Sequence, residues 1–203
     1  MAETMTPSES MTSGQIGKIQ ELLGAGLRKA DLPGDATQEV LENQGHQLVG
    51  ELVAVVRKFV EAVCSLICRI VTVNRVQEPR QALEATGRVL YVDDDVVKTM
   101  PRGKGEKAKV FFFKVGRYVS DDQLEEECAS RGLVPTDPYS LAKVNEDDPA
   151  FADSHPNGTH WKDSSGKWCY AAFRQWHDGK RSVYVDRRGS GWDGYWWFAG
   201  SRE

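Results

Sequence analysis

The sequence predicts an α+β protein in which an N-terminal helical hairpin or long helix precedes a small domain with an antiparallel, Trp-rich β-sheet. Apolar residues recur at helical spacing in the first third of the chain, and short alternating strand patterns follow. All six tryptophans lie between positions 161 and 197. We therefore expect a disordered tail over residues 1–13, a helical region over 14–78 and an α+β domain over 79–203.

The first predicted helix covers residues 14–30. Ser13 can cap its N-terminus, because a serine hydroxyl accepts a hydrogen bond from a free backbone N–H of the first turn. Its apolar positions share one helical face: Ile16, Ile19, Leu22, Leu23 and Leu27. The turn-forming residues 31–34 (DLPG) end it.

A second, longer helix is predicted from Asp35, with Gln38 completing a capping box, to about Val73. Its apolar seam alternates steps of three and four residues: Val49, Leu52, Val56, Phe59, Val63, Leu66 and Ile70. One short preceding helix cannot cover this seam over residues 48–71. The C-terminal domain, a second copy of the chain or another protein must bury the remainder, and the sequence leaves these alternatives open.

Beyond residue 78 the pattern changes to short elements. Residues 88–92 and 109–118 predict strands, and residues 121–129, capped by Ser120, predict a helix. A further short helix is expected from Asp137-Pro138 through Val144. Residues 145–160 are polar and rich in turn formers, so no regular element is expected there.

The C-terminal segment predicts a β-meander of three strands over residues 167–176, 181–186 and 194–199. The Asp-Gly and Gly-rich connections between them are typical of hairpins. Basic residues outnumber acidic ones 8 to 5 over residues 161–203.

Composition narrows the classes of function. A net charge of −4 argues against a dedicated nucleic-acid binder, which needs a basic face. No apolar stretch approaches the roughly 18 residues of a membrane helix, so no membrane partner is expected. Residues 1–13 lack the basic start and apolar stretch of a secretory signal. A cytoplasmic protein with reduced cysteines is therefore expected.

Several groups of residues could in principle bind a metal or act in catalysis, but a structural role explains each group better. His155, His160, Cys169 and His177 include zinc-ligand types, but their spacing matches no zinc motif, so we expect no metal and no cofactor. Cys128 or Cys169 beside a histidine would resemble a nucleophile and its base, without local support.

Other groups are also explained by structure. Cys64 and Cys68 would share a helical face and are expected to be buried small apolar residues. The acidic runs 93–95 and 125–127 fit helix starts and solvated surface better than a cation site. The basic loop over 102–107 lacks the spacing of a phosphate-binding loop.

The tryptophans are the strongest functional signal. Strand alternation sends Trp196 and Trp197 to opposite faces, so at least one aromatic side chain is expected at a surface. Exposed Trp and Tyr beside Arg serve sugar stacking and protein binding, although most of these rings are expected in the core. The residues predicted to bind a ligand are Trp176, Trp192, Tyr195, Trp196, Arg174, Arg187 and Arg188.

Two stretches of the sequence, and part of the predicted helical region, resemble those of other proteins. Residues 131–142 (RGLVPTDPYSLA) and 192–202 (WDGYWWFAGSR), with residues 50–62 (GELVAVVRKFVEA), resemble a group of uncharacterised bacterial proteins of uncultivated lineages. That resemblance implies no activity. The order of a short helix after an RGL-x-P turn and an aromatic sheet ending in W-x-G-x-x-x-F distantly resembles the C-type-lectin-like and formylglycine-generating fold. The paired catalytic cysteines of those enzymes are missing, since only Cys169 lies late in the domain.

The leading hypothesis is a non-catalytic binding module that uses the aromatic surface for a carbohydrate or another small ligand. One alternative is a scaffold that self-associates, or binds a protein partner, through the apolar helix at 48–71. The other alternative is an enzyme, which would need a pocket containing at least two of five residues: His155, His160, Cys169, His177 and Asp193. No catalytic residue is assigned.

Overall fold

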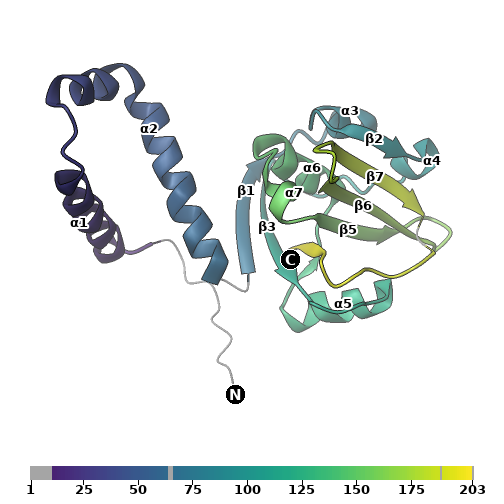
Figure 1. The fold of residues 1–203 in the computed structure, drawn as a ribbon. Coiled ribbons are helices and arrows are strands. Elements are labelled where there is room, and N and C mark those ends of the chain that lie inside the picture. Colours follow the sequence, from purple (N-terminus) through teal and green to yellow (C-terminus); the bar gives the residue numbers. More distant parts are fainter. Residues whose placement is uncertain (1–10, 64–65, 188, 203) are drawn as a thin grey trace. The chain divides into compact units, whose positions relative to one another are not determined.

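The computed structural model describes residues 11–63, 66–187 and 189–202, and it confirms the α+β class (Figure 1). The chain divides into two compact units, Met1–Ser65 and Leu66–Glu203. We call them the helical unit and the sheet unit.

The helical unit contains α1 (Ser13–Lys29) and α2 (Gly34–Val63). Thr12, one residue before the predicted cap, closes a capping box with Gln15: its hydroxyl accepts from the Gln15 N–H, and the Gln15 side chain accepts from the Thr12 N–H. None of the side chains described in this unit is buried. These two helices therefore lack a core of their own.

The prediction that the second helix runs to Val73 is wrong, because α2 ends at Val63 and β1 (Leu66–Thr72) follows. The LICRIVT run suits a strand as well as a helix. Pairing with β3 (Lys107–Lys114) along seven residues decides in favour of the strand. Cys68 therefore lies on a strand and does not share a helical face with Cys64, which is outside the described residues.

The sheet unit is built on an eight-stranded mixed sheet in the order β1-β3-β8-β5-β6-β7-β2, with β4 paired to β8. The remaining strands are β2 (Val89–Val92), β4 (Val134–Pro135), β5 (Asn157–Lys162), β6 (Trp168–Gln175), β7 (Arg181–Arg187) and β8 (Trp197–Ser201).

The prediction of an antiparallel sheet ending in a three-stranded meander needs correction. β2 lies parallel to β7, and β5 lies parallel to β8. The β6–β7 hairpin is confirmed, but β8 lies between β3 and β5 instead of beside β7. The segment after β7 crosses the sheet before β8 begins, so the last strand pairs with strands far away in the sequence. Residues 157–160 of β5 fall in the segment that was predicted to be irregular.

One face of the sheet carries most of the helices, which are α3 (Pro79–Glu84), α4 (Asp94–Val97), α6 (Pro138–Asp147) and α7 (Phe151–Ser154). Side chains from these helices meet Phe112, Phe173, Val183 and Val185 of the sheet in the larger core. Helix α3 was not predicted; Pro79 at its start and the reciprocal bonds between Glu78 and Gln81 form its N-terminus.

The opposite face, which we call the α5 face, is covered by α5 (Asp121–Ser130) and by the segment between β7 and β8 (Figure 1). Ser120 caps α5 as predicted. Leu124 and Cys128 of α5 pack with Phe111 and Phe113 of β3 in the second core. Helix α5 does not extend over β6, β7 and β2, and the aromatic residues of those strands form the candidate site.

Candidate functional site

The α5 face of β6 and β7 carries a row of polar and aromatic side chains. Strand alternation directs Tyr170, Ala172 and Arg174 of β6 to this face, together with Tyr184 of β7. Val183 and Val185 point the opposite way into the larger core. Buried aliphatic residues on one side thus fix which residues of the hairpin are presented on the other.

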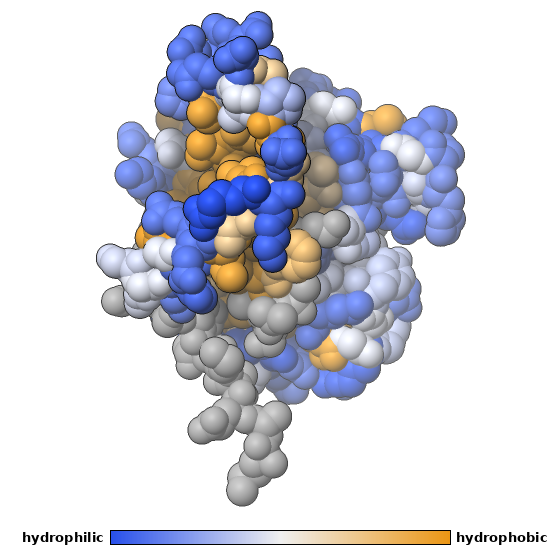
Figure 2. Space-filling model, turned by 60° about the vertical axis from the view of Figure 1, so that its left-hand side comes forward, coloured by the Kyte–Doolittle hydropathy of each residue, from blue (hydrophilic) through white to orange (hydrophobic). Residues whose placement is uncertain are grey.

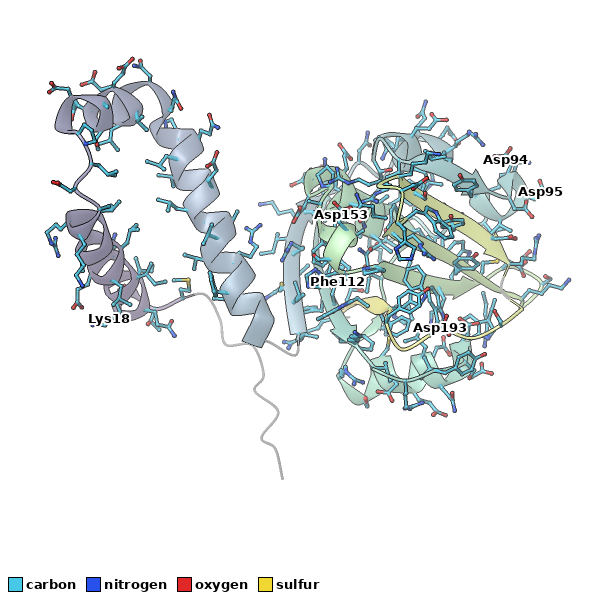
Figure 3. All side chains as sticks on the ribbon, viewed as in Figure 1. Lys18, Asp94, Asp95, Phe112, Asp153 and Asp193 are labelled. Carbon is cyan, nitrogen blue, oxygen red and sulfur yellow. The ribbon has the colours of Figure 1, made fainter. Side chains whose placement is uncertain are left out.

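A cavity of about 500 Å³ lies over this row. This volume falls within the range of small-molecule pockets in proteins. The cavity is lined by Tyr118, Tyr170, Ala172, Arg174, Trp176, Tyr184, Arg187, Gly189, Ser190, Gly191, Asp193, Tyr195 and Trp196. Figure 3 places Asp193 in the segment that precedes β8.

Two glycines bring the segment before β8 against the segment after β3. A Cβ on Gly191 would lie 2.3 Å from the carbonyl oxygen of Val119, and one on Gly194 would lie 2.8 Å from the backbone nitrogen of Arg117. Neither distance is sterically possible without a shift of the backbone. Val119 and Trp192 also form an antiparallel bridge. Backbone contacts therefore build one wall of the cavity.

Trp192 anchors that wall and is itself fully buried. Its ring packs against Tyr170, Trp196 and Phe198, and its Nε1–H donates to Asp121 Oδ1 at 2.8 Å. The same carboxylate oxygen lies 2.9 Å from Nδ1 of the buried His160. Trp192 is thus a structural residue, and the prediction that it forms part of the contact surface is wrong.

The opposite wall is a connected aromatic set. Nε1–H of Trp176 donates to the Tyr184 hydroxyl at 2.7 Å, and the guanidinium of Arg174 lies 3.8 Å from the centre of the Trp176 ring. Tyr184 stacks on Tyr91 with 5.1 Å between ring centres. Trp176 and Tyr195 are 40% and 43% exposed, so both rings are available to a ligand.

The polar groups of the cavity are mostly hydrogen-bond donors. The Tyr184 hydroxyl accepts from Trp176, and the Tyr118 hydroxyl accepts from the Gly191 N–H at 2.7 Å. Neither hydroxyl donates to another described residue, so its proton can be donated to a ligand. Arg174 forms no ion pair with any described residue. The carboxylate of Asp193 is the exposed acceptor at the rim.

Five predicted residues line the cavity, namely Arg174, Trp176, Arg187, Tyr195 and Trp196. Arg187 is neutralised there, since its Nε lies 3.2 Å from Asp163 and its Nη1 lies 3.6 Å from Asp93. Trp196 is only 7% exposed, so it offers little surface to a ligand. Arg188 lies outside the described residues.

Three tyrosines that line the cavity were not among the predicted site residues: Tyr118, Tyr170 and Tyr184. The alternation of residues 181–186 does separate Tyr184 from Val183 and Val185, and this signal identifies Tyr184 as a surface residue. No local pattern links Tyr118 to this hairpin, because a long-range contact brings it there.

The residues considered for catalysis and metal binding do not come together. Of the five residues named for an enzyme pocket, only Asp193 lines the cavity. His155 stacks on Phe151, and Cys169 is buried in the larger core. Across the described ranges, no group of three His, Cys, Asp or Glu residues is placed to hold a metal ion.

The cysteine environments oppose nucleophilic activation. Burial raises the pKa of the Cys128 thiol to about 12, and burial also raises the pKa of Cys169. Both thiols are therefore protonated at neutral pH.

The acidic runs and the basic loop have structural partners. Asp93 caps α4, and Asp95 forms an ion pair with Lys98. Glu127 forms ion pairs with Arg117 and Arg131. Arg102 of the basic loop donates to the carbonyl oxygens of Arg75 and Gln77.

No family model, curated protein or solved structure matches this chain. The resemblances to uncharacterised bacterial proteins and to the C-type-lectin-like layout therefore stay predictions. None of the described helices is long and apolar enough to cross a membrane.

Proposed function

We propose that the sheet unit is a non-catalytic binding module that holds a small sugar carrying an anionic group in the aromatic cavity. The proposal rests on three donor groups at the walls that have no acceptor among the described side chains: the guanidinium of Arg174 and the hydroxyls of Tyr118 and Tyr184. A partly buried cation without a carboxylate partner favours an anionic ligand group, because charge-assisted bonds are stronger than neutral ones.

The exposed aromatic side chains favour a ligand that contains a sugar ring. Trp176 and Tyr195 present apolar rings across a cavity of about 500 Å³, which admits a sugar ring. The exposed carboxylate of Asp193 is an acceptor for ligand hydroxyl groups. Stacking, hydroxyl recognition and an anion contact together describe an acidic or phosphorylated sugar better than a neutral sugar or a purely apolar compound.

Calorimetric titration of the full chain with four probes tests the proposal. The probes are glucuronate, glucose 6-phosphate, glucose and benzoate. A charge-assisted hydrogen bond contributes about 1.5–3 kcal/mol, so we expect at least one anionic sugar to bind about tenfold or more tightly than glucose. Benzoate, which lacks hydroxyl groups, should bind more weakly than that sugar. The two anionic sugars distinguish a carboxylate from a phosphate.

Two arginine variants test whether the preference for an anionic sugar arises at the cavity. Arg174→Gln should abolish the preference for the anionic sugar, whereas Arg80→Gln, which removes the same charge from α3 outside the cavity, should preserve it. Equal affinity for glucose and both anionic sugars would contradict the proposal. Absence of binding by every probe, or an equal loss in both variants, would contradict it as well.

A further inference from the structure

The helical unit presents a wide apolar stripe along α2 (Figure 2). At 3.6 residues per turn, one face of α2 gathers Leu41, Leu48, Val49, Leu52, Val53, Val56, Phe59 and Val60. Phe59 is 72% exposed and Val49 is 58% exposed. A seam with apolar residues also on both flanks is typical of a bundle helix, which contacts more than one neighbour.

Helix α1 adds apolar residues without closing a core. Ile16, Leu22, Leu23 and Leu27 are all exposed, and no described residue of α1 is buried. Helices of this length gain most of their stability in proteins by packing an apolar face against a partner. The stripe therefore has to be covered for the two helices to persist.

The charges beside the stripe indicate what covers it. Between Asp35 and Glu51, α2 carries acidic residues and neither Lys nor Arg, whereas Arg57 follows in its last third. Helical periodicity places Glu39 and Arg57 at the same angle on one flank of the stripe, and Glu42 lies at the edge of the stripe on that side. In an antiparallel helix pair, equivalent flanks of the two helices face one another. Arg57 of one copy then meets the acidic flank of the other, twice in a symmetric pair.

We propose that the helical unit is a dimerisation module, in which α2 pairs antiparallel with α2 of a second copy and both α1 helices complete a four-helix bundle. A two-fold interface is self-complementary, and this stripe with its opposed charges has that property. Eleven large apolar residues of α1 and α2 are exposed. At about 60–120 Å² for each fully buried side chain, partial burial of this set approaches the roughly 800 Å² per partner of a stable interface.

The exposed apolar residues of the sheet unit match the apolar stripe of α2 less well than a second helical unit does. Apart from the aromatics at and beside the cavity, its described large apolar residues with high exposure are Ile70, Val76 and Val89. They come from separate strands and a loop, so they form no stripe of comparable length. A second helical unit is the surface of matching length and apolar character.

Sedimentation analysis of the full chain over a range of concentrations tests the proposal. We expect the mass to rise from 22.7 kDa towards twice that value as concentration increases. Phe59→Glu, which places a charge in the centre of the stripe, should weaken the dimer more than tenfold. Ala54→Glu adds the same charge on the opposite face of α2 and should leave association unchanged. Near-UV circular dichroism, which reports on the tryptophans of the sheet unit, verifies that this unit stays folded in each variant.

A charge exchange tests the antiparallel orientation. Glu42→Arg and Arg57→Glu should each weaken association, and the double variant should restore it. A chain that is monomeric at every concentration, or that assembles into trimers or larger species, would overturn the dimer. Dimerisation that survives Phe59→Glu, or that is lost equally in Ala54→Glu, would overturn the assigned face. Failure of the double variant to recover would overturn the antiparallel pairing.

Discussion

The two units of this chain use apolar side chains in opposite ways. In the sheet unit, Trp192 is 0% exposed and is surrounded by other rings, whereas Phe59 of the helical unit is 72% exposed. Both residues belong to segments whose patterns indicate apolar contacts. A pattern of apolar residues thus identifies the face to be buried but does not identify what buries it. In the sheet unit the chain buries that face itself, and in the helical unit we propose that a second copy does.

Removing one large ring from each unit should give the greatest contrast. Trp192→Ala should destabilise the sheet unit by about 3–5 kcal/mol, because it removes a fully buried ring and leaves a cavity. Phe59→Ala should change the unfolding of the sheet unit by less than about 0.5 kcal/mol. Urea denaturation followed by near-UV circular dichroism measures both. A similar loss of unfolding free energy in the two variants would contradict the difference between the units.

Glycine-to-alanine changes should have opposite signs in the two units. A Cβ on Gly158 of β5 would lie 2.7 Å from the Trp192 ring, so Gly158→Ala should cost about 1–3 kcal/mol. A Cβ on Gly50 of α2 meets nothing within 4 Å, so Gly50→Ala should increase helix stability by about 0.5–1 kcal/mol. Thermal unfolding monitored in the far ultraviolet reports both changes. Stabilisation by Gly158→Ala would mean that the ring does not occupy this place.

The turn between β5 and β6 should add a pH-dependent contribution to the sheet unit. Hydrogen bonds from the Ser165 hydroxyl and the Lys167 backbone N–H, with Arg187 beside them, lower the pKa of Asp163 to about 2. The ionised form is therefore stabilised in the folded state. This stability is fully present above the ordinary carboxyl pKa near 3.9 and is lost as pH falls towards 2.

Melting temperatures of the natural chain and of Asp163→Asn between pH 2 and 7 measure this effect. The natural chain should be more stable above about pH 4, and the difference should shrink between about pH 4 and pH 2. A difference that is constant with pH would show that the Asp163 charge contributes nothing.

Exposed rings at the cavity should have the smallest effect on folding. Tyr195 is 43% exposed and contacts the Trp196 ring with 5.2 Å between centres. Tyr195→Ala should therefore cost about 1 kcal/mol or less, while weakening binding of the anionic sugar. Urea denaturation and calorimetry on the same sample separate the two effects. A loss of stability comparable to that of Trp192→Ala would place Tyr195 in the core instead.

Local patterns predicted much of the fold, and long-range pairing explains what they missed. Ser120 and Asp137 each accept a bond from the first turn of a helix, as their positions predicted. The LICRIVT run satisfies helical and strand spacing alike, and only its pairing with β3 decides between them. The position of β8 depends on a crossing of the sheet that local turn residues do not encode.

The candidate site was predictable where strand alternation or composition determines it. Arg174, Trp176 and Tyr195 stand out as aromatic or basic residues in a turn-rich hairpin region, and the structure places all three at one cavity. Trp192 is also a tryptophan, like Trp176, but it is buried. Gly158 leaves space for its ring, and Asp121 accepts a hydrogen bond from its indole N–H. Residue type alone cannot distinguish these two tryptophans.

The most direct test of the proposed binding site is a titration followed by nuclear magnetic resonance of the six tryptophan indole N–H groups. The indole of Trp176 should shift most on addition of glucuronate or glucose 6-phosphate, because its Nε1–H is bonded to Tyr184 at the cavity wall. The indole signals of Trp161 and Trp192, which are bonded to Thr99 and Asp121, should stay in place. Shifts confined to Trp161 or Trp192, or no shift of Trp176 with either sugar, would contradict the account.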